Sequence, residues 1–219
     1  MCFTGVILNP YRRPIHDEVV GRLLEEMEWN PEGFYVYSLD PRVYIRTLDY
    51  ERFRPTLSQV LGSNPPAVHF HFRLATVGKV AVYNVHGWDI GGHLVTHNGI
   101  VEAYSYEDES GYSDTLRLVA QKRFREFLLG KRWKNLYEYL SEKDFKGVMF
   151  IVSRDFNEVY AISRGRSIRY YRLNNVTYAT SKELLTGSRL RKARVEAYAN
   201  GVFQVTYDRV LGVVYTGEE

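Results

Sequence analysis

The sequence predicts an α+β protein in which β-sheets are covered by helices. Three observations support this prediction. Apolar residues recur at helical spacing in the first third of the chain, and short runs of β-branched and aromatic residues lie before and after that helical pattern. The last third consists almost entirely of such runs, separated by turn residues. With 219 residues, 45% of them apolar, and no stretch that resembles a linker, we expect a single domain over residues 1–219.

Helices are expected in five places. The first is indicated by apolar residues at positions 15, 19, 20, 23, 24 and 27, with charged residues between them. Ser113 is a suitable N-cap for a helix that runs to about Phe127, and Ser181 for a short helix over Lys182–Leu185. The remaining helices are expected at Arg54–Leu61, which ends at a glycine, and near Leu136–Leu140.

Strands are expected where β-branched and aromatic residues cluster between turn signals. Asn98–Gly99, Asn174–Asn175 and Asn200–Gly201 are expected to form turns, because these residues tolerate positive φ. Residues Thr76–Trp88 are glycine-containing and lack a sustained period, which predicts a surface loop. The expected strands are Cys2–Leu8, Gly33–Tyr37, Arg42–Leu48, Ala67–Leu74, His93–Thr96, Gly147–Ser153, Val159–Ser163, Ile168–Leu173, Val176–Thr180, Val202–Tyr207 and Val210–Tyr215.

Composition excludes several classes of protein. No apolar run approaches the ~20 residues of a membrane span, and the polar run after Leu8 argues against a signal peptide. A net charge of +3 favours an ordinary solvated surface over a nucleic-acid partner. We expect a cytoplasmic protein, because one cysteine permits no disulfide framework. No metal or other cofactor is expected, since His69 and His71 have no third ligand nearby.

Cys2 is the only cysteine in the chain, and removal of Met1 would give it a thiol and a free α-amine on one carbon. These groups titrate near pKa ~8.5 and ~8, so the amine can take the thiol proton and the thiolate can attack a carbonyl. Whether Met1 is removed is not evident from the sequence. The alternative is structural, with Cys2 as a small apolar residue at the start of a buried strand.

Three further stretches concentrate polar groups. Arg73 lies at the exit of an expected strand, beside a glycine loop, and can hold a carboxylate through two parallel hydrogen bonds. The Asn98 side chain and the Gly99 backbone N–H can together stabilise an oxyanion. Asp114, in the first turn of a helix, can hold an ammonium. Each also has a structural alternative, namely a surface ion pair, a hairpin turn and a charge that complements the helix dipole. Together, the four groups fit hydrolysis of the side-chain amide of a free amino acid.

The order of these motifs resembles the glutaminase domain of class II glutamine amidotransferases, which are N-terminal nucleophile (Ntn) hydrolases. The resemblance covers nearly the whole chain. Phe3, Val77 and Val85–His86–Gly87 depart from the family's usual residues, which leaves the subfamily and the strength of glutamine binding open. The matching stretches are Cys2, His71–Thr76, Asn84–His86, His97–Ile100, Ser113–Thr115, Gly147–Asp155 and Ala179–Leu185.

The resemblance implies a four-layer αββα sandwich and a glutaminase mechanism. The amide of glutamine would be cleaved through a γ-glutamyl thioester, with the α-amine of Cys2 as base. Ammonia would pass to a separate synthase or acceptor subunit, or to water. The implied residues are Cys2 as nucleophile, Asn98 and Gly99 as oxyanion donors, Arg73 for the substrate carboxylate, Asp114 for its α-amine, Thr76 in the loop that closes over the substrate, and His97 as a further substrate-binding residue.

Two other functions remain open at this stage. Cysteine-first hydrolases of other amides, such as N-acyl amino acids, begin with a stretch similar to Cys2–Gly5. An inactive protein that binds an amino acid or serves as a scaffold is also compatible with the architecture, because one fold hosts many activities. The sequence does not specify the ammonia acceptor or the oligomeric state.

Overall fold

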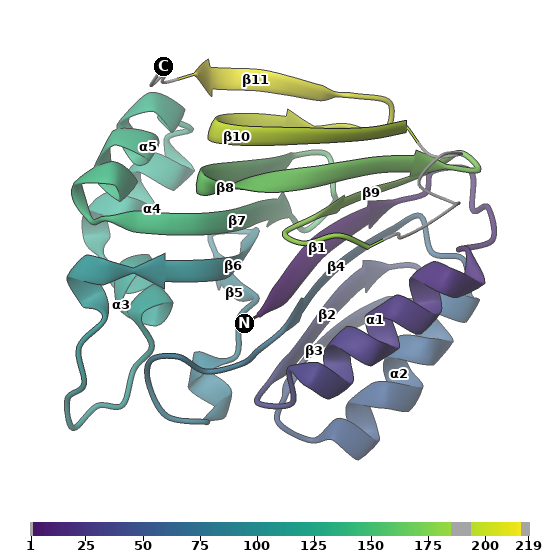
Figure 1. Ribbon diagram of the computed structural model, residues 1–219, viewed down its shortest axis with the longest axis horizontal. Helices are drawn as coiled ribbons and strands as arrows, with labels where there is room; N and C mark the ends of the chain where they lie inside the picture. Colours follow the sequence, from purple (N-terminus) through teal and green to yellow (C-terminus); the bar gives the residue numbers. More distant parts are fainter. Residues whose placement is uncertain (1, 185–193, 216–219) are drawn as a thin grey trace.

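The computed structural model describes residues 2–184 and 194–215, which form one antiparallel sheet of 11 strands with helices on its outer faces (Figure 1). The strands are β1 (Phe3–Leu8), β2 (Phe34–Leu39), β3 (Arg42–Thr47), β4 (Ala67–Phe72), β5 (Trp88–Ile90), β6 (His93–Val101), β7 (Phe145–Ser153), β8 (Val159–Leu173), β9 (Val176–Thr180), β10 (Arg194–Val205) and β11 (Val210–Tyr215). The helices are α1 (Asp17–Trp29), α2 (Tyr50–Gly62), α3 (Asp114–Ala120), α4 (Lys122–Leu129) and α5 (Trp133–Glu142), with 3-10 turns η1 (Val82–Asn84) and η2 (Glu102–Tyr104).

The sheet curls so that its first strands face its later ones. Its order is β3-β2-β4-β1-β9-β8-β7-β6-β5, and β10 and β11 extend it from β8. Thr4 on β1 and His69 on β4 both hydrogen-bond Thr96 on β6, which shows that the two halves of the sheet are in contact. Apolar side chains such as Val6 and Phe150 fill the rest of the space between the halves. The α+β prediction is therefore confirmed.

The helices cover the two outer faces of this curled sheet. Helices α1 and α2 place Leu23 and Phe53 against the half that contains β1, β2 and β4. Helices α3 to α5 place Leu118 and Leu136 against the half that contains β6 and β7 (Figure 1). The helices bury their apolar stripes and expose most of their charged residues, as the helical spacing predicts, but Glu26 of α1 and Asp114 and Arg117 of α3 are buried. No helix of the described residues is long and apolar enough to cross a membrane.

Seven of the expected strands and α1 lie within two residues of their predicted ends, whereas α2, α5, β6 and β10 are longer than expected. Ser113 caps α3 and accepts a hydrogen bond from the Leu116 N–H at 3.2 Å. Asn174 and Asn175 form the β8–β9 turn with φ of 52° and 60°, the left-handed conformation expected of them. The helix predicted from Ser113 to Phe127 is divided at Gln121 into α3 and α4, and the loop after Thr76 contains η1 and the short β5.

Two expected turns are wrong. Asn98–Gly99 lies within β6, where Gly99 pairs with Gly147 of β7. Asn200–Gly201 lies within β10, where Asn200 has a φ of 54° at an irregularity in the pairing with β8. The same residue types serve hairpin turns and β-bulges, because both need positive φ or a missing side chain. Local sequence cannot choose between them.

Two further element predictions need correction. Residues 159–173 form one long strand, β8, and not two strands. Its first part pairs with β7 and its last part with β9, and Gly165, with a φ of 66°, lies between them. Glycine there allows the strand to change direction, whereas the sequence suggested a break. Ser181 caps no helix over residues 182–184, and residue 185 of the expected helix lies outside the described residues.

A polar layer lies buried between the two halves of the sheet. His69 is fully buried, with Nε2 2.9 Å from Thr96 Oγ1 and Nδ1 3.1 Å from the Tyr35 hydroxyl. Thr4 Oγ1 lies 2.7 Å from Thr96 Oγ1 and donates to the Phe70 carbonyl at 2.9 Å. Burial lowers the pKa of His69 to about 3, so this imidazole remains neutral in the folded protein.

This lowered pKa predicts a loss of stability in mild acid. Below pH ~6.5 the unfolded chain binds a proton at His69 and the folded chain does not. The free energy of unfolding therefore decreases as the pH is lowered from ~6.5 to the folded-state pKa of about 3. Between pH 7 and pH 5.5 we expect His69 to account for about 1.3 kcal/mol of the lost unfolding free energy. Urea titrations of wild type and His69→Gln at both pH values measure this difference. Equal pH dependence in the two proteins would contradict the assignment.

Candidate functional site

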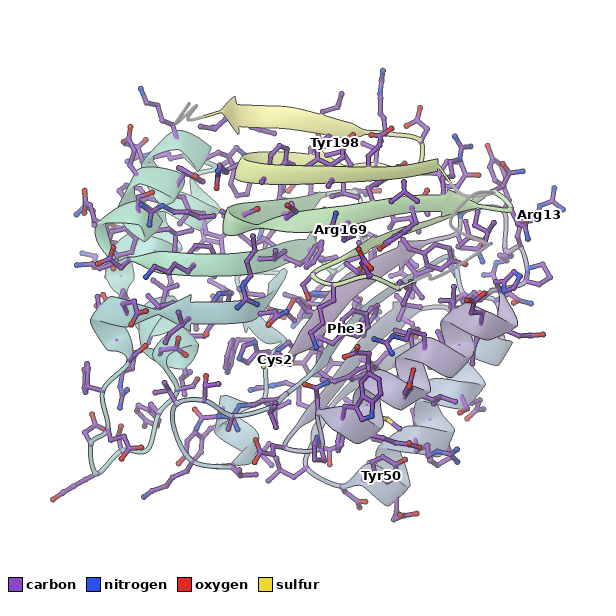
Figure 2. All side chains as sticks on the ribbon, viewed as in Figure 1. Cys2, Phe3, Arg13, Tyr50, Arg169 and Tyr198 are labelled. Carbon is purple, nitrogen blue, oxygen red and sulfur yellow. The ribbon has the colours of Figure 1, made fainter. Side chains whose placement is uncertain are left out.

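Cys2 lies at the N-terminal end of β1, where the loop that follows β4 passes (Figure 2). Its sulfur lies 3.4 Å from both the backbone N–H and the carbonyl oxygen of Leu74. The residue is partly exposed, but its thiol is surrounded by protein, and burial raises the pKa of the thiol. The sulfur is therefore a protonated thiol near neutral pH unless a base removes its proton.

A small cavity of about 20 Å³ lies beside this sulfur. Its lining brings together all the predicted site residues except Asn98, although they come from four separate parts of the chain. A space of this size holds about one water molecule. The lining residues are Cys2, Arg73, Leu74, Ala75, Thr76, Val77, His86, His97, Gly99, Ser113, Asp114 and Thr115.

Arg73 is 2% exposed and contributes its guanidinium to this cavity. Its donors reach the carbonyl oxygens of Val77 at 3.1 Å and Lys79 at 3.4 Å, both in the loop after β4. Within the described part of the chain, no carboxylate forms an ion pair with it. Burial lowers the pKa of Arg73, although it stays far above neutrality for an arginine. A buried guanidinium held only by carbonyl groups is a strong binding site for a carboxylate.

Asp114, at the first position of α3, is 5% exposed. Its Oδ2 accepts the Val101 N–H and its Oδ1 accepts the Thr115 N–H, each at 2.7 Å. These bonds fix the carboxylate against the end of β6 and leave lone pairs for a further donor. Asp114 and Arg73 thus place opposite charges on the lining of one cavity.

Asn98 on β6 is fully buried, and its Nδ2 lies 2.9 Å from Ser181 Oγ. Its Oδ1 has no partner among the described residues. Ser181 Oγ already accepts the Thr4 N–H at 3.2 Å, so the serine proton is free. Rotating the Asn98 amide by 180° lets Oδ1 accept that proton and turns Nδ2 away from Ser181, so that Nδ2 becomes a donor available to a ligand. Ser181 is thus a site residue that sequence reasoning assigned to a helix cap.

Gly99 is required by its surroundings. A Cβ at this position would lie 1.9 Å from the Lys146 carbonyl oxygen and 2.6 Å from His97 Nε2. Gly147, opposite in β7, has a φ of 139° and would place a Cβ 2.8 Å from the same imidazole. The His97 ring lies over this pair of glycines. No other residue fits at position 99 without displacing the strand.

Thr76 and His97 contribute differently to the cavity. Thr76 is exposed in the loop after β4. The His97 ring is bound on both sides, with Nδ1 2.9 Å from Thr115 Oγ1 and Nε2 3.4 Å from the Lys146 carbonyl, and burial lowers its pKa to about 4. His97 therefore joins α3 to β7 behind the cavity, a supporting role that the sequence did not indicate.

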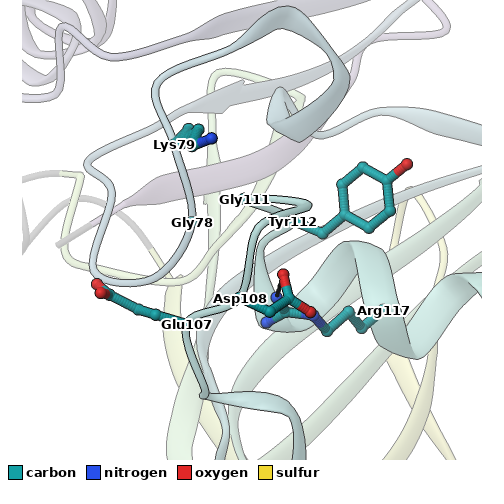
Figure 3. Close-up of a pocket in the computed structure, with 7 residues that line it drawn as sticks. All are labelled: Gly78, Lys79, Glu107, Asp108, Gly111, Tyr112 and Arg117. Atoms are coloured by element: carbon teal, nitrogen blue, oxygen red, sulfur yellow. Dashed lines mark hydrogen bonds and ion pairs between the residues drawn. The ribbon is translucent and has the colours of Figure 1, made fainter.

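The loop after Thr76 is attached to the segment before α3. Asn84 donates to the carbonyls of Lys79 and Gly111 at 2.8 Å and accepts the Ser113 N–H at 2.8 Å. Between these segments lies a second pocket of about 180 Å³, which includes the Arg117–Asp108 ion pair (Figure 3). The full lining of this pocket is Gly78, Lys79, Glu107, Asp108, Gly111, Tyr112 and Arg117.

Comparisons with known proteins define the fold. No protein-family model matches the chain, and no curated protein matches it. Among solved structures, the allosteric regulatory enzyme of purine biosynthesis is similar over 95% of this chain and 48% of its own, with a TM-score of 0.61 and 14% identity. The glutamine phosphoribosylpyrophosphate amidotransferase from B. subtilis is similar over 96% of this chain and 48% of its own length, with a TM-score of 0.56 and 13% identity. A glutamine aminotransferase class-II domain protein from Silicibacter pomeroyi is similar over 99% of this chain and 100% of its own length, with a TM-score of 0.58 and 12% identity.

This chain has the class II glutamine amidotransferase fold. It spans about half the length of the two enzymes named first and the full length of the domain protein. The amidotransferase fold explains why the predicted residues meet although they are distant in sequence. Cys2 directly precedes β1, Arg73 directly follows β4, Asn98 and Gly99 lie on β6, and Asp114 begins α3.

Proposed function

We propose that this protein hydrolyses the side-chain amide of glutamine, with Cys2 as the nucleophile. The Cys2 thiolate would attack the amide carbon, and the tetrahedral oxyanion would be stabilised by Asn98 Nδ2 and the Gly99 N–H. Its collapse would release ammonia and leave a γ-glutamyl thioester, which water then hydrolyses to glutamate. One observation carries this proposal: the sulfur of Cys2, the guanidinium of Arg73, the carboxylate of Asp114 and Gly99 line the same cavity.

The base in this mechanism would be the α-amine of Cys2 after Met1 has been removed. Burial raises the pKa of the thiol, so the thiolate is scarce near neutral pH. An amine with a pKa of ~7.7 to 8.0 on the same residue can accept the proton and return it to the leaving ammonia. This requirement makes removal of Met1 part of the proposal.

Substrate binding would require the loop after β4 to move. The cavity of about 20 Å³ is far smaller than an amino acid, and Arg73 is bound to the Val77 and Lys79 carbonyls. The substrate carboxylate would replace these two carbonyls on the guanidinium, and its ammonium would approach Asp114. The exposed Thr76 lies in the part of the loop that would then enclose the ligand.

Several finer features belong to the same proposal. Residues 1–219 would form one amidotransferase type 2 domain whose helices and curled sheet make the four layers of an αββα sandwich of Ntn hydrolase type. The ammonia would be used by a separate synthase or acceptor subunit, or pass to water. A reducing compartment such as the cytoplasm would keep the single thiol active. No cofactor is needed for this chemistry.

Intact-mass measurement of the purified protein, with and without a glutamine-mimicking alkylator, tests the proposal. We expect a mass that lacks Met1 and the addition of one equivalent of the alkylator. Glutamine should protect the thiol from modification. Retention of Met1 in all molecules, or modification that glutamine leaves unchanged, would contradict the mechanism.

Arg73 gives a quantitative prediction for substrate binding. Charge-assisted hydrogen bonds to a carboxylate are worth about 1.5 to 3 kcal/mol, so Arg73→Ala should lower kcat/KM for glutamine by about 10- to 100-fold, mainly through KM. Arg73→Lys should recover only part of the loss, because an ammonium cannot bind both oxygens in parallel. Steady-state kinetics with glutamine and with N-acyl amino acids separates the functions: a loss confined to glutamine supports glutamine as substrate.

A second candidate is an inactive protein that binds an amino acid. It is favoured by the burial of the Cys2 sulfur, which raises the pKa of the thiol and leaves little thiolate near neutral pH. A ligand that binds only the folded state raises the melting temperature by mass action. Thermal stabilisation by glutamine, with no glutamate released over hours, would select this candidate over the hydrolase.

A further inference from the structure

Two stacked imidazoles lie against the backbone just before Asn98. His71 on β4 and His86 after η1 have ring centroids 3.9 Å apart and planes inclined by 16°. The His97 N–H donates to His86 Nδ1 at 3.0 Å, and His71 Nε2 lies 3.1 Å from the His97 carbonyl oxygen. The backbone N–H and C=O of His97 are therefore both bound by side chains, which come from two other segments of the chain.

These side chains occupy a place where a strand is missing. On this side of β6, the pairing with β5 covers His93, Leu94 and Val95, and the Gly87 N–H donates to the Val95 carbonyl at 2.9 Å. Beyond Val95 only β7 continues, on the other side. In an antiparallel strand, the N–H and C=O of successive residues point to alternate edges. The backbone N–H and C=O of His97 and of Gly99 therefore point to the edge of β6 that β5 no longer covers. His71 and His86 bind those of His97, and the N–H of Gly99 is the next donor along this edge.

The partners determine which ring nitrogen carries the proton in each imidazole. A carbonyl can only accept, so His71 carries its proton on Nε2, and its Nδ1 is buried with no partner among the described residues. An N–H can only donate, so Nδ1 of His86 is unprotonated. Burial lowers the pKa of both imidazoles well below the usual range, in agreement with two neutral rings.

We propose that His71 and His86 are a pair of positioning residues that replace a strand at the free edge of β6 and hold the Gly99 N–H and the Asn98 side chain in place for an oxyanion. This inference rests on the proposed hydrolysis. Neither imidazole needs to touch the substrate. Their effect passes through the His97 peptide, which is covalently joined to Asn98.

The two histidines use different ring atoms, which allows a reciprocal substitution test. The Oδ1 of asparagine occupies about the position of histidine Nδ1, and the Nε2 of glutamine about that of histidine Nε2. His86→Asn therefore keeps an acceptor for the His97 N–H, and His86→Gln displaces it. Conversely, His71→Gln keeps a donor for the His97 carbonyl, and His71→Asn displaces it. All four variants lose one ring, so each pair is matched for packing.

We expect kcat for glutamine to fall at least tenfold in His86→Gln and His71→Asn, with KM within about threefold of wild type. His86→Asn and His71→Gln should retain kcat within about threefold. If Asn and Gln act alike at both positions, or if kcat simply follows the melting temperature, the two residues are only packing groups and the inference is wrong.

Amide hydrogen exchange at His97, measured by NMR, tests the inference without any activity. We expect faster exchange in His86→Gln than in His86→Asn, because only the second keeps the acceptor. A wild-type protein that shows slow exchange but no glutamine hydrolysis would overturn the proposed function and leave the structural role of the pair intact. Equal exchange in the two His86 variants would overturn the pair itself.

Discussion

Cys2→Ala should abolish glutamine hydrolysis, with kcat reduced by at least about 10³-fold, because no other residue of the cavity can form a thioester. Cys2→Ser should be almost as inactive, since a buried hydroxyl is a weaker nucleophile than a thiol. Release of glutamate and ammonia, followed in coupled assays, measures the loss.

The folded state should tolerate both substitutions at position 2. Among the described residues, the sulfur has two long hydrogen bonds, both to the backbone of Leu74, so the melting temperature should change little. Cys2→Ala should also still bind glutamine through Arg73 and Asp114, which calorimetry can measure. A Cys2→Ala protein that turns over glutamine at the wild-type rate would disprove the nucleophile.

Asn98→Asp should lower kcat by about 10²- to 10³-fold, the usual effect of losing one oxyanion donor. The substitution keeps the shape of the side chain and replaces the donor NH₂ with a carboxylate oxygen, which repels an oxyanion. KM should change little, because the contact forms only in the transition state. Stopped-flow or steady-state kinetics on the purified variant gives kcat and KM separately.

Ser181→Ala should reproduce part of this effect, with kcat lowered by about tenfold, because Asn98 would lose the partner that fixes its orientation. Ser163→Ala is the matched control. Ser163 is also a buried serine, but its hydroxyl donates to the Arg166 carbonyl. An equal loss of kcat in both variants would show that Ser181 acts through stability alone.

Local patterns were sufficient for most of the secondary structure. Helical spacing of apolar residues located α1, and alternating or β-branched runs located β1, β4 and β7. The errors are at Asn98–Gly99, Gly165 and Asn200–Gly201, where residues that permit positive φ were assigned to turns or breaks. In the protein these positions lie within strands or bends, because the neighbouring strand continues past them.

The candidate site was predicted in part. Cys2, Arg73, Gly99 and Asp114 have chemistry that can be recognised in short motifs, and the structure brings them to one cavity. His71, His86 and Ser181 were missed or assigned other roles. Their contribution depends on partners that are 11 to 83 residues away in the chain, as in the His86–His97 and Asn98–Ser181 contacts.

The sequence by itself determined the kinds of group available: a thiol at position 2, a guanidinium after a strand, an amide followed by glycine, and a carboxylate at the start of a helix. It also determined the α+β class, because periodicity is a local property of the chain. The tertiary structure alone decided that the β5 side of β6 has no strand partner beyond Val95 and that two imidazoles bind this free edge. Such pairings depend on the curl of the whole sheet, which brings β4 and β6 into contact, and no local pattern encodes that distance.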